Sequence, residues 1–133
     1  MAEKRSQVRP RTGGHISVEQ MAAEDGRYHP QAFYFVYEGL EHKLRQLGER
    51  RHLTAEELLD GLRQLALEQF GLLARTVLEQ WGVSRTEDVG EMVYLLIEHG
   101  LLFRTEKDSK EEFKDVFDFR QAFDDSYQVP ARL

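Results

Sequence analysis

The stretch PQAFYFVYEGLEHKLRQLG, residues 30–48, carries the clearest structural signal in the sequence. Large apolar side chains recur in it every three or four residues, which is the spacing of one face of an α-helix. Pro30 suits the first turn of a helix, because the N–H that proline lacks would be unpaired there anyway. The stretch therefore predicts a helix that ends before Gly48. Its apolar stripe consists of Phe33, Val36, Tyr37, Leu40, Leu44 and Leu47.

Tyr34 and Phe35 lie off this stripe, so the first half of the helix is apolar nearly all round. Such a surface needs cover, either from the preceding part of the chain or from a second subunit. We favour intramolecular cover. Because aromatic side chains often dominate protein interfaces, Tyr28, Tyr34 and Phe35 would also suit a hot spot for a protein partner.

Two helices are predicted by capping boxes, in which a Ser or Thr is followed three residues later by Glu or Gln. Ser17 with Gln20 begins a short helix, and Thr54 with Glu57 begins a longer one. We expect these helices to end near Gly26 and Gly71.

Two further helices are predicted between Gly71 and Gly100. In the first, which Gly82 ends, we expect inward side chains from Leu73, Val77, Leu78 and Trp81. Ser84 with Glu87, or Thr86 alone, caps the second. Its core face consists of Val89, Met92, Val93, Leu96 and Ile97.

The pattern changes after Gly100, because apolar and polar residues begin to alternate. Alternation with a polar turn between two runs predicts an antiparallel hairpin, whose return strand Asp115 and Asp118 would shorten. The alternating positions are Leu101, Phe103 and Thr105, then Phe113, Phe117 and Phe119, with the turn at Lys107-Asp108-Ser109-Lys110. The expected fold is mainly α with a small C-terminal antiparallel β-hairpin (α+β).

Length and charge predict one domain with a basic extension. The 133 residues contain no Cys and are 41% hydrophobic, which suits a single core without disulfides or thiolate metal sites. We expect a flexible basic arm over 1–15, one domain over 16–127 and a tail over 128–133. The net charge is −6, but the arm carries Lys4, Arg5, Arg9 and Arg11 against Glu3, and the rest holds 14 basic against 23 acidic residues. An acidic body disfavours a broad contact with nucleic acid.

Motifs for several enzyme classes are missing from the sequence. No Ser lies in Gly-x-Ser-x-Gly or Ser-x-x-Lys, and no glycine-rich phosphate loop occurs. We therefore expect no cofactor. No apolar run reaches the length of a membrane span and the N-terminus lacks a signal-like apolar region, so we expect a cytoplasmic protein with no membrane contact.

Residues 54–119 resemble a winged-helix domain in the order of their elements, and the segment 80–86 (QWGVSRT) resembles the turn of a helix-turn-helix. The resemblance places the helix Thr86–His99 in the position that reads DNA. A DNA-reading helix needs cations and amides, but this one carries Glu87, Asp88, Glu91 and Glu98. The winged-helix-like second half is therefore expected to bind protein rather than DNA.

The chain over about residues 16–127 also resembles a small bacterial protein family of uncharacterised function. The resemblance lies in RYHP (27–30), LALEQFGLLARTVL (65–78), Trp81-Gly82 and TED (86–88). It implies a bacterial cytosolic protein. It supplies no activity, ligand or site residue.

A metal site on the first long helix is the first enzymatic possibility. Glu38, Glu41 and His42 are spaced so that their side chains can approach one another. A di-metal bundle needs matching ligands on facing helices, and only Glu91, Glu98 and His99 come near that pattern, at the wrong spacing. We favour a solvated face in which Glu41 pairs with Arg45.

By elimination, the sequence predicts a non-catalytic adaptor or regulatory module that binds another protein or a second copy of itself. The expected contact residues are Tyr34, Phe35, Glu38, Glu87, Asp88 and Glu91. One alternative is a nucleic-acid-associated regulator in which the arm residues Lys4, Arg5, Arg9 and Arg11 contact phosphates. A metal-dependent enzyme is the third possibility.

Overall fold

The two helices predicted from capping boxes begin where the sequence predicts. In the computed structural model, which describes residues 17–103 and 109–125, α1 spans Val18–Asp25 and α3 spans Ala55–Phe70. Both predicted capping boxes are present: Ser17 Oγ and Thr54 Oγ1 each accept a 3.1 Å hydrogen bond from the backbone N–H three residues later. Each satisfies an N–H that the helix itself cannot pair.

The long helix α2 spans Pro30–Leu47, as predicted. His29 precedes it, and its Nδ1 accepts a 3.0 Å hydrogen bond from the N–H of Gln31. Gly48 ends α2 with φ of 74°, a conformation that costs glycine little. Within the stripe, Phe33, Val36 and Leu44 are buried, while Leu47 at the end of the helix is 37% exposed.

A sharp turn joins α3 to the next helix. Gly71–Leu73 form a single 3-10 turn, η1, and α4 then runs over Ala74–Gln80. Leu78 is buried as predicted, but the inward placement predicted for Leu73 is wrong, because its side chain is 62% exposed. The helical spacing that placed Leu73 inward does not continue through the 3-10 turn.

The fifth helix and the C-terminal segment complete the described chain. α5 spans Thr86–Glu98, with Val89, Met92, Val93 and Leu96 buried as predicted. A 3-10 turn, η2, follows at Lys110–Phe113, and a π-helical turn, η3, at Arg120–Asp125.

The predicted C-terminal hairpin is wrong. Over residues 17–103 and 109–125 the protein is helical, without strands, so its second half has no hairpin to serve as a wing. The alternating phenylalanines are used differently. Phe117, Phe119 and Phe123 pack ring against ring at centroid distances of 5.1–6.2 Å. Aromatic clustering, rather than strand pairing, accounts for their spacing.

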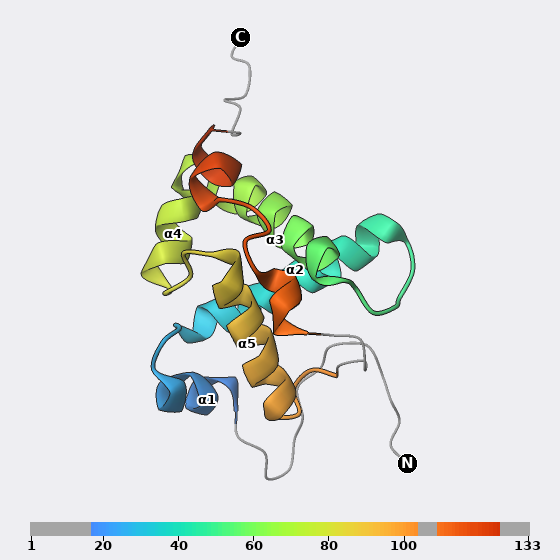
Figure 1. Cartoon of the computed structure of the whole chain (residues 1–133), viewed down its shortest axis with the longest axis vertical. Helices are drawn as coiled ribbons and strands as arrows, with labels where there is room; N and C mark the ends of the chain where they lie inside the picture. Colours follow the sequence, from blue (N-terminus) through green and yellow to red (C-terminus); the bar gives the residue numbers. More distant parts are fainter. Residues whose placement is uncertain (1–16, 104–108, 126–133) are drawn as a thin grey trace.

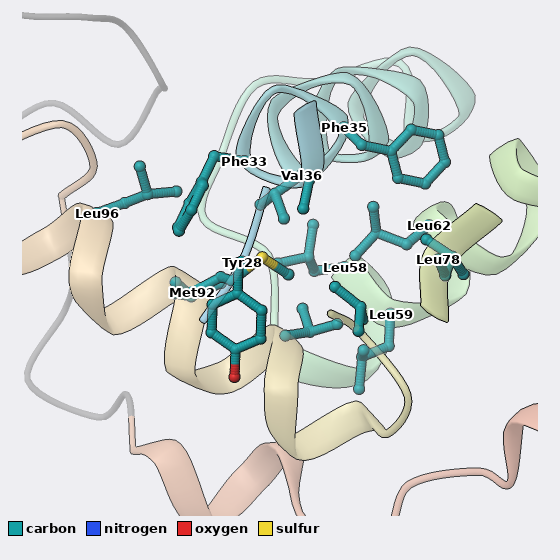
Figure 2. Packing of buried hydrophobic residues seen from close by; sticks show 14 of the residues in the cluster. Tyr28, Phe33, Phe35, Val36, Leu58, Leu59, Leu62, Leu78, Met92 and Leu96 are labelled. Atoms are coloured by element: carbon teal, nitrogen blue, oxygen red, sulfur yellow. The ribbon is translucent and has the colours of Figure 1, made fainter. Parts of the chain in front are cut away.

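The core lies where α2, α3 and α5 meet. Figure 1 shows α2 crossing the middle of the molecule beneath α3, with α5 descending beside it and α1 at the lower end. In Figure 2, side chains from α2, α3 and α5 point into one shared interior. The side chains with almost no exposure include Phe33, Val36, Leu59, Met92 and Leu96.

Two glycines allow α2 and α3 to approach closely. A Cβ added to Gly61 would lie 2.7 Å from the carbonyl oxygen of Gly39 and 2.9 Å from Cβ of Lys43. A Cβ on Gly39 would overlap the side chain of Leu62. The crossing therefore depends on the absence of side chains at both positions.

Several predicted features lie outside the described residues. These are the whole basic arm over 1–15, including Lys4, Arg5, Arg9 and Arg11, the tail over 128–133, and Thr105, Lys107 and Asp108 of the expected hairpin.

Candidate partner-binding site

Asp88 caps α5 from inside the helix. Its Oδ2 accepts backbone hydrogen bonds from Ser84 at 2.9 Å and from Arg85 at 3.1 Å. The prediction that Ser84 or Thr86 caps this helix is therefore wrong. A carboxylate at this end of a helix also interacts favourably with the helix dipole.

The same carboxylate binds a side chain from the beginning of α2. Tyr28, which is 5% exposed, donates its phenolic hydrogen to Oδ1 of Asp88 at 2.8 Å. Burial, together with this hydrogen bond, raises the pKa of Tyr28 well above its ordinary value. Asp88 thus joins two distant segments of the chain, so it is not a free charge for a partner.

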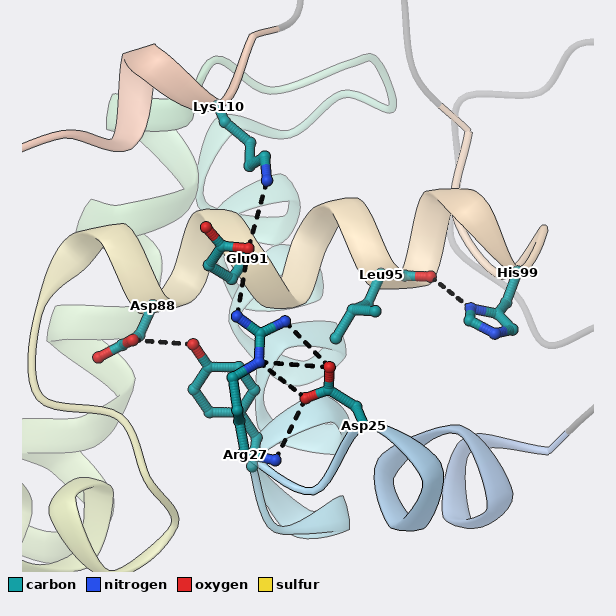
Figure 3. Close-up of polar contacts among 8 residues, drawn as sticks. Asp25, Arg27, Asp88, Glu91, Leu95, His99 and Lys110 are labelled. Carbon is teal, nitrogen blue, oxygen red and sulfur yellow. Dashed lines mark hydrogen bonds and ion pairs between the residues drawn. The ribbon is translucent and has the colours of Figure 1, made fainter.

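Arg27 connects the α1–α2 loop to α5. Figure 3 shows its guanidinium between Asp25 and Glu91, with Lys110 on the other side of Glu91. Nη2 of Arg27 lies 3.0 Å from Asp25, and Nη1 lies 3.4 Å from Glu91. Nζ of Lys110 lies 3.3 Å from the same Glu91 oxygen. The hydrogen bond from Arg27 holds the pKa of Asp25 below its usual range.

Glu87 and Thr86 hold the C-terminal segment on α5. Glu87 accepts a 3.1 Å hydrogen bond from the N–H of Asp115. The buried Thr86 hydroxyl donates to the carbonyl of Phe113 at 2.6 Å and accepts from the N–H of Val116 at 3.1 Å. The three carboxylates expected to face a partner, on Glu87, Asp88 and Glu91, therefore all serve contacts within the chain.

The other expected contact residues lie on α2. Phe35 is buried, with its ring 5.7 Å from the rings of Phe70 and Trp81, so the predicted intramolecular cover is present there. Tyr34 is half-buried and donates a 2.7 Å hydrogen bond to Glu19 of α1. Glu38 is exposed. The structure therefore does not gather the six predicted residues into one exposed patch.

The residues weighed as possible metal ligands are not assembled. Both oxygens of Glu41 accept hydrogen bonds from Arg50, at 3.2 and 3.1 Å, and this contact lowers the pKa of Glu41. Nε2 of His42 is buried without a hydrogen-bond partner. Among residues 17–103 and 109–125, no group of three or more His, Asp and Glu side chains could hold a metal ion.

Two cavities lie among the described residues. One, of about 20 Å³, lies in the core between α3 and the phenylalanines of the C-terminal segment, and its wall is apolar. The other, of about 60 Å³, lies between α5 and the α2–α3 loop and includes His52 and Tyr94. Sites for organic ligands usually measure several hundred Å³. Neither cavity is a strong candidate.

The most exposed large apolar side chains in the described chain lie in η1. Leu72 is 63% exposed and Leu73 is 62% exposed. We call residues 71–73 the elbow. Gly71 turns the backbone there with φ of 54°, which separates the two leucines from the helical faces on either side. Behind the elbow, Phe70 packs edge-on against Trp81 at 5.9 Å.

Two exposed carboxylates belong to segments next to the elbow. Glu68 precedes the elbow by three residues on α3, and Asp125 belongs to η3, a segment that contacts η1. Arg75 of α4 is held by Glu79 at 3.1 Å and by Asp124 at 2.7 Å, and Arg120 at the start of η3 is exposed. Because exposed carboxylates outnumber exposed cations in these segments, we call Glu68 and Asp125 the acidic rim of the elbow.

Sequence reasoning missed this site. A signal was present in Gly71-Leu72-Leu73, because a glycine that ends one helix interrupts the helical spacing on which the inward assignment of Leu73 depended. That signal was overridden by assigning Leu73 to the following helical stripe. The resemblance quoted for residues 65–78 covers the elbow, but it assigned no role to it.

No helix within the described residues has the length and apolar character needed to cross a membrane. Comparisons with protein-family models, curated proteins and solved structures find no match to this chain. The resemblances to a bacterial family and to winged-helix domains therefore stay predictions. The candidate site is argued from geometry alone.

Proposed function

We propose that this protein is a non-catalytic, cytoplasmic protein-binding module, an adaptor or regulatory subunit of a bacterial cell, whose contact surface is centred on the elbow. The observation that carries the proposal is the exposure of Leu72 and Leu73, each above 60%, in the 3-10 turn η1. Single exposed leucines are ordinary, but two adjacent ones expose more apolar surface in one place. Burial of such side chains against a partner is favourable.

The elbow replaces the contact surface expected from the sequence. Of that surface, Tyr34 and Glu38 remain accessible, whereas Phe35 is buried and the three α5 carboxylates have partners within the chain. Removing an internal carboxylate would therefore disturb the fold, which makes it a poor probe of binding.

The nucleic-acid alternative depends on the basic arm. The described residues hold 11 Lys and Arg against 21 Asp and Glu, so the body would repel phosphates. Binding to nucleic acid would therefore have to come from Lys4, Arg5, Arg9 and Arg11, and we treat it as an outcome of the experiment that follows.

The test is a comparative purification of tagged wild-type protein and the double variant Leu72→Ser/Leu73→Ser from the native host. It is carried out at low salt, with and without nuclease, and retained proteins are quantified by mass spectrometry. Leu47→Ser is the matched control, because Leu47 is a partly exposed leucine remote from the elbow in sequence. Circular dichroism checks that all three proteins are folded.

We expect wild type and Leu47→Ser to retain a partner protein in stoichiometric amount, with or without nuclease. The double variant should not retain it. Equal retention by all three proteins would exclude the elbow as the contact surface. Retention that disappears with nuclease would favour the arm-based alternative over the adaptor function.

A further inference from the structure

The charge around the elbow limits what can dock there. Leu72 and Leu73 offer apolar surface, while the exposed Glu68 lies three residues before the elbow and the exposed Asp125 lies in η3, which contacts η1. Arg75 does not offset these charges, since Glu79 and Asp124 already neutralise it. A partner that covers the leucines must approach these carboxylates.

From this charge pattern we infer that the partner presents an amphipathic segment, with apolar side chains that cover Leu72 and Leu73 and Lys or Arg side chains that face Glu68 and Asp125. This inference rests on the proposed function and deepens it. An acidic segment would place like charges together at the rim, which weakens association and rejects such partners.

A second copy of the chain is a poorer occupant on the same grounds. Two elbows meeting about a twofold axis would bring two acidic rims together. Two leucines from each copy also supply much less than the roughly 800 Å² per partner that a stable interface buries. A contact of this size suits a short segment of another protein.

The test uses three fluorescein-labelled helical peptides of equal length against the full-length protein. The first alternates Leu and Lys at helical spacing, the second carries Glu in place of Lys, and the third carries Ser in place of Leu. Binding is measured by fluorescence anisotropy at low and at physiological salt. The peptides separate the apolar contribution from the charge contribution.

Three proteins are compared with wild type. Leu72→Ser/Leu73→Ser removes the apolar surface, and Glu68→Gln/Asp125→Asn removes the acidic rim. Glu24→Gln/Glu38→Gln removes the same number of exposed carboxylates from α1 and the middle of α2. In Figure 1, α1 lies at the opposite end of the molecule from η3, so Glu24 is remote from the elbow.

We expect the Leu/Lys peptide to bind at least about tenfold more tightly than either other peptide. The leucine variant should lose that advantage. The rim variant should weaken binding about threefold and reduce its dependence on salt, because fewer charges are then screened. The Glu24→Gln/Glu38→Gln control should bind as wild type does.

The failures are distinguishable. Equally tight binding of the Leu/Glu peptide, still lost in the leucine variant, would overturn the charge inference and leave the proposed function intact. If the Leu/Lys peptide binds the Leu72→Ser/Leu73→Ser variant as tightly as wild type, both the charge inference and the proposed function are overturned. A concentration-dependent dimer in analytical ultracentrifugation, absent from the leucine variant, would identify a second copy as the occupant and overturn the inference.

Discussion

The phenolic oxygen of Tyr28 lies 2.8 Å from Oδ1 of Asp88, across 60 residues of sequence. The second oxygen of that carboxylate accepts from the N–H groups of Ser84 and Arg85. One side chain therefore caps α5 and attaches the beginning of α2 to it. This double role explains why an acidic residue that was expected to contact a partner is instead part of the fold.

Asp88→Ala should destabilise the protein by about 2–3 kcal/mol, because it removes a cap and leaves the buried Tyr28 hydroxyl unpaired. Tyr28→Phe should cost less, about 1 kcal/mol, since it removes the hydroxyl together with its need for a partner. Urea denaturation measures both. Glu38→Ala, on an exposed part of α2, is the control and should change stability by less than about 0.5 kcal/mol. Equal effects of Asp88→Ala and Glu38→Ala would contradict the assigned role.

Thr86→Val should destabilise the protein by about 2 kcal/mol while keeping its shape. The substitution leaves the carbonyl of Phe113 and the N–H of Val116 without the hydroxyl that they share. Hydrogen exchange should then accelerate at the amide of Val116. Thr76→Val is the control, because Thr76 is exposed on α4. Unchanged exchange at Val116 would show that another contact holds the C-terminal segment on α5.

Gly61→Ala should destabilise the protein by about 1–3 kcal/mol, although alanine is the better helix former. The new Cβ would lie 2.7 Å from the carbonyl oxygen of Gly39, so α2 and α3 would have to separate. Thermal unfolding followed by circular dichroism gives the comparison. Gln69→Ala, at an exposed position of α3, is the control for an alanine introduced into the same helix. A Gly61→Ala protein more stable than wild type would refute the close crossing.

Stability should fall as the pH decreases from about 5 to 2, in part through Glu57. The Arg51 guanidinium, together with the backbone N–H of Thr54, lowers the pKa of Glu57 to about 2. A carboxyl group whose pKa is lower in the folded state stabilises above its unfolded pKa, and this contribution disappears as the pH approaches the folded pKa. Its side chain is 29% exposed, so solvent screening limits the contribution to about 1 kcal/mol.

Glu57→Gln should therefore be about 1 kcal/mol less stable than wild type at pH 7 and nearly equal to it at pH 2. Chemical denaturation at a series of pH values measures the difference. Glu56→Gln, its exposed neighbour in the same turn, is the control. A difference between wild type and Glu57→Gln that does not change with pH would exclude the ion pair as its cause.

How much the sequence predicted varies along the chain. The capping boxes at Ser17 and Thr54, and the helix end at Gly48, are confirmed because these signals act over three or four residues. The hairpin prediction failed because alternation over so short a segment does not distinguish a strand from irregular packing. Phe113 instead lies against Gly90 of α5: a Cβ added to Gly90 would be 2.9 Å from the Cβ of Phe113.

In the candidate site, too, the sequence predicted local features but not contacts between distant residues. Sequence reasoning could identify Glu87, Asp88 and Glu91 as a run of acidic side chains on one helix, but it could not supply their partners Asp115, Tyr28 and Arg27. Likewise, the composition around Leu72 and Leu73 does not reveal that the 3-10 turn exposes both leucines.

The sequence by itself determined the positions of α1 to α5 along the chain and the acidic character of the body, because these depend on local hydrogen bonds, helical spacing and composition. Only the tertiary structure decided which charges serve the fold and which apolar side chains remain exposed. The physical reason is that both outcomes depend on contacts between residues distant in sequence, such as Tyr28 with Asp88 and η3 with η1.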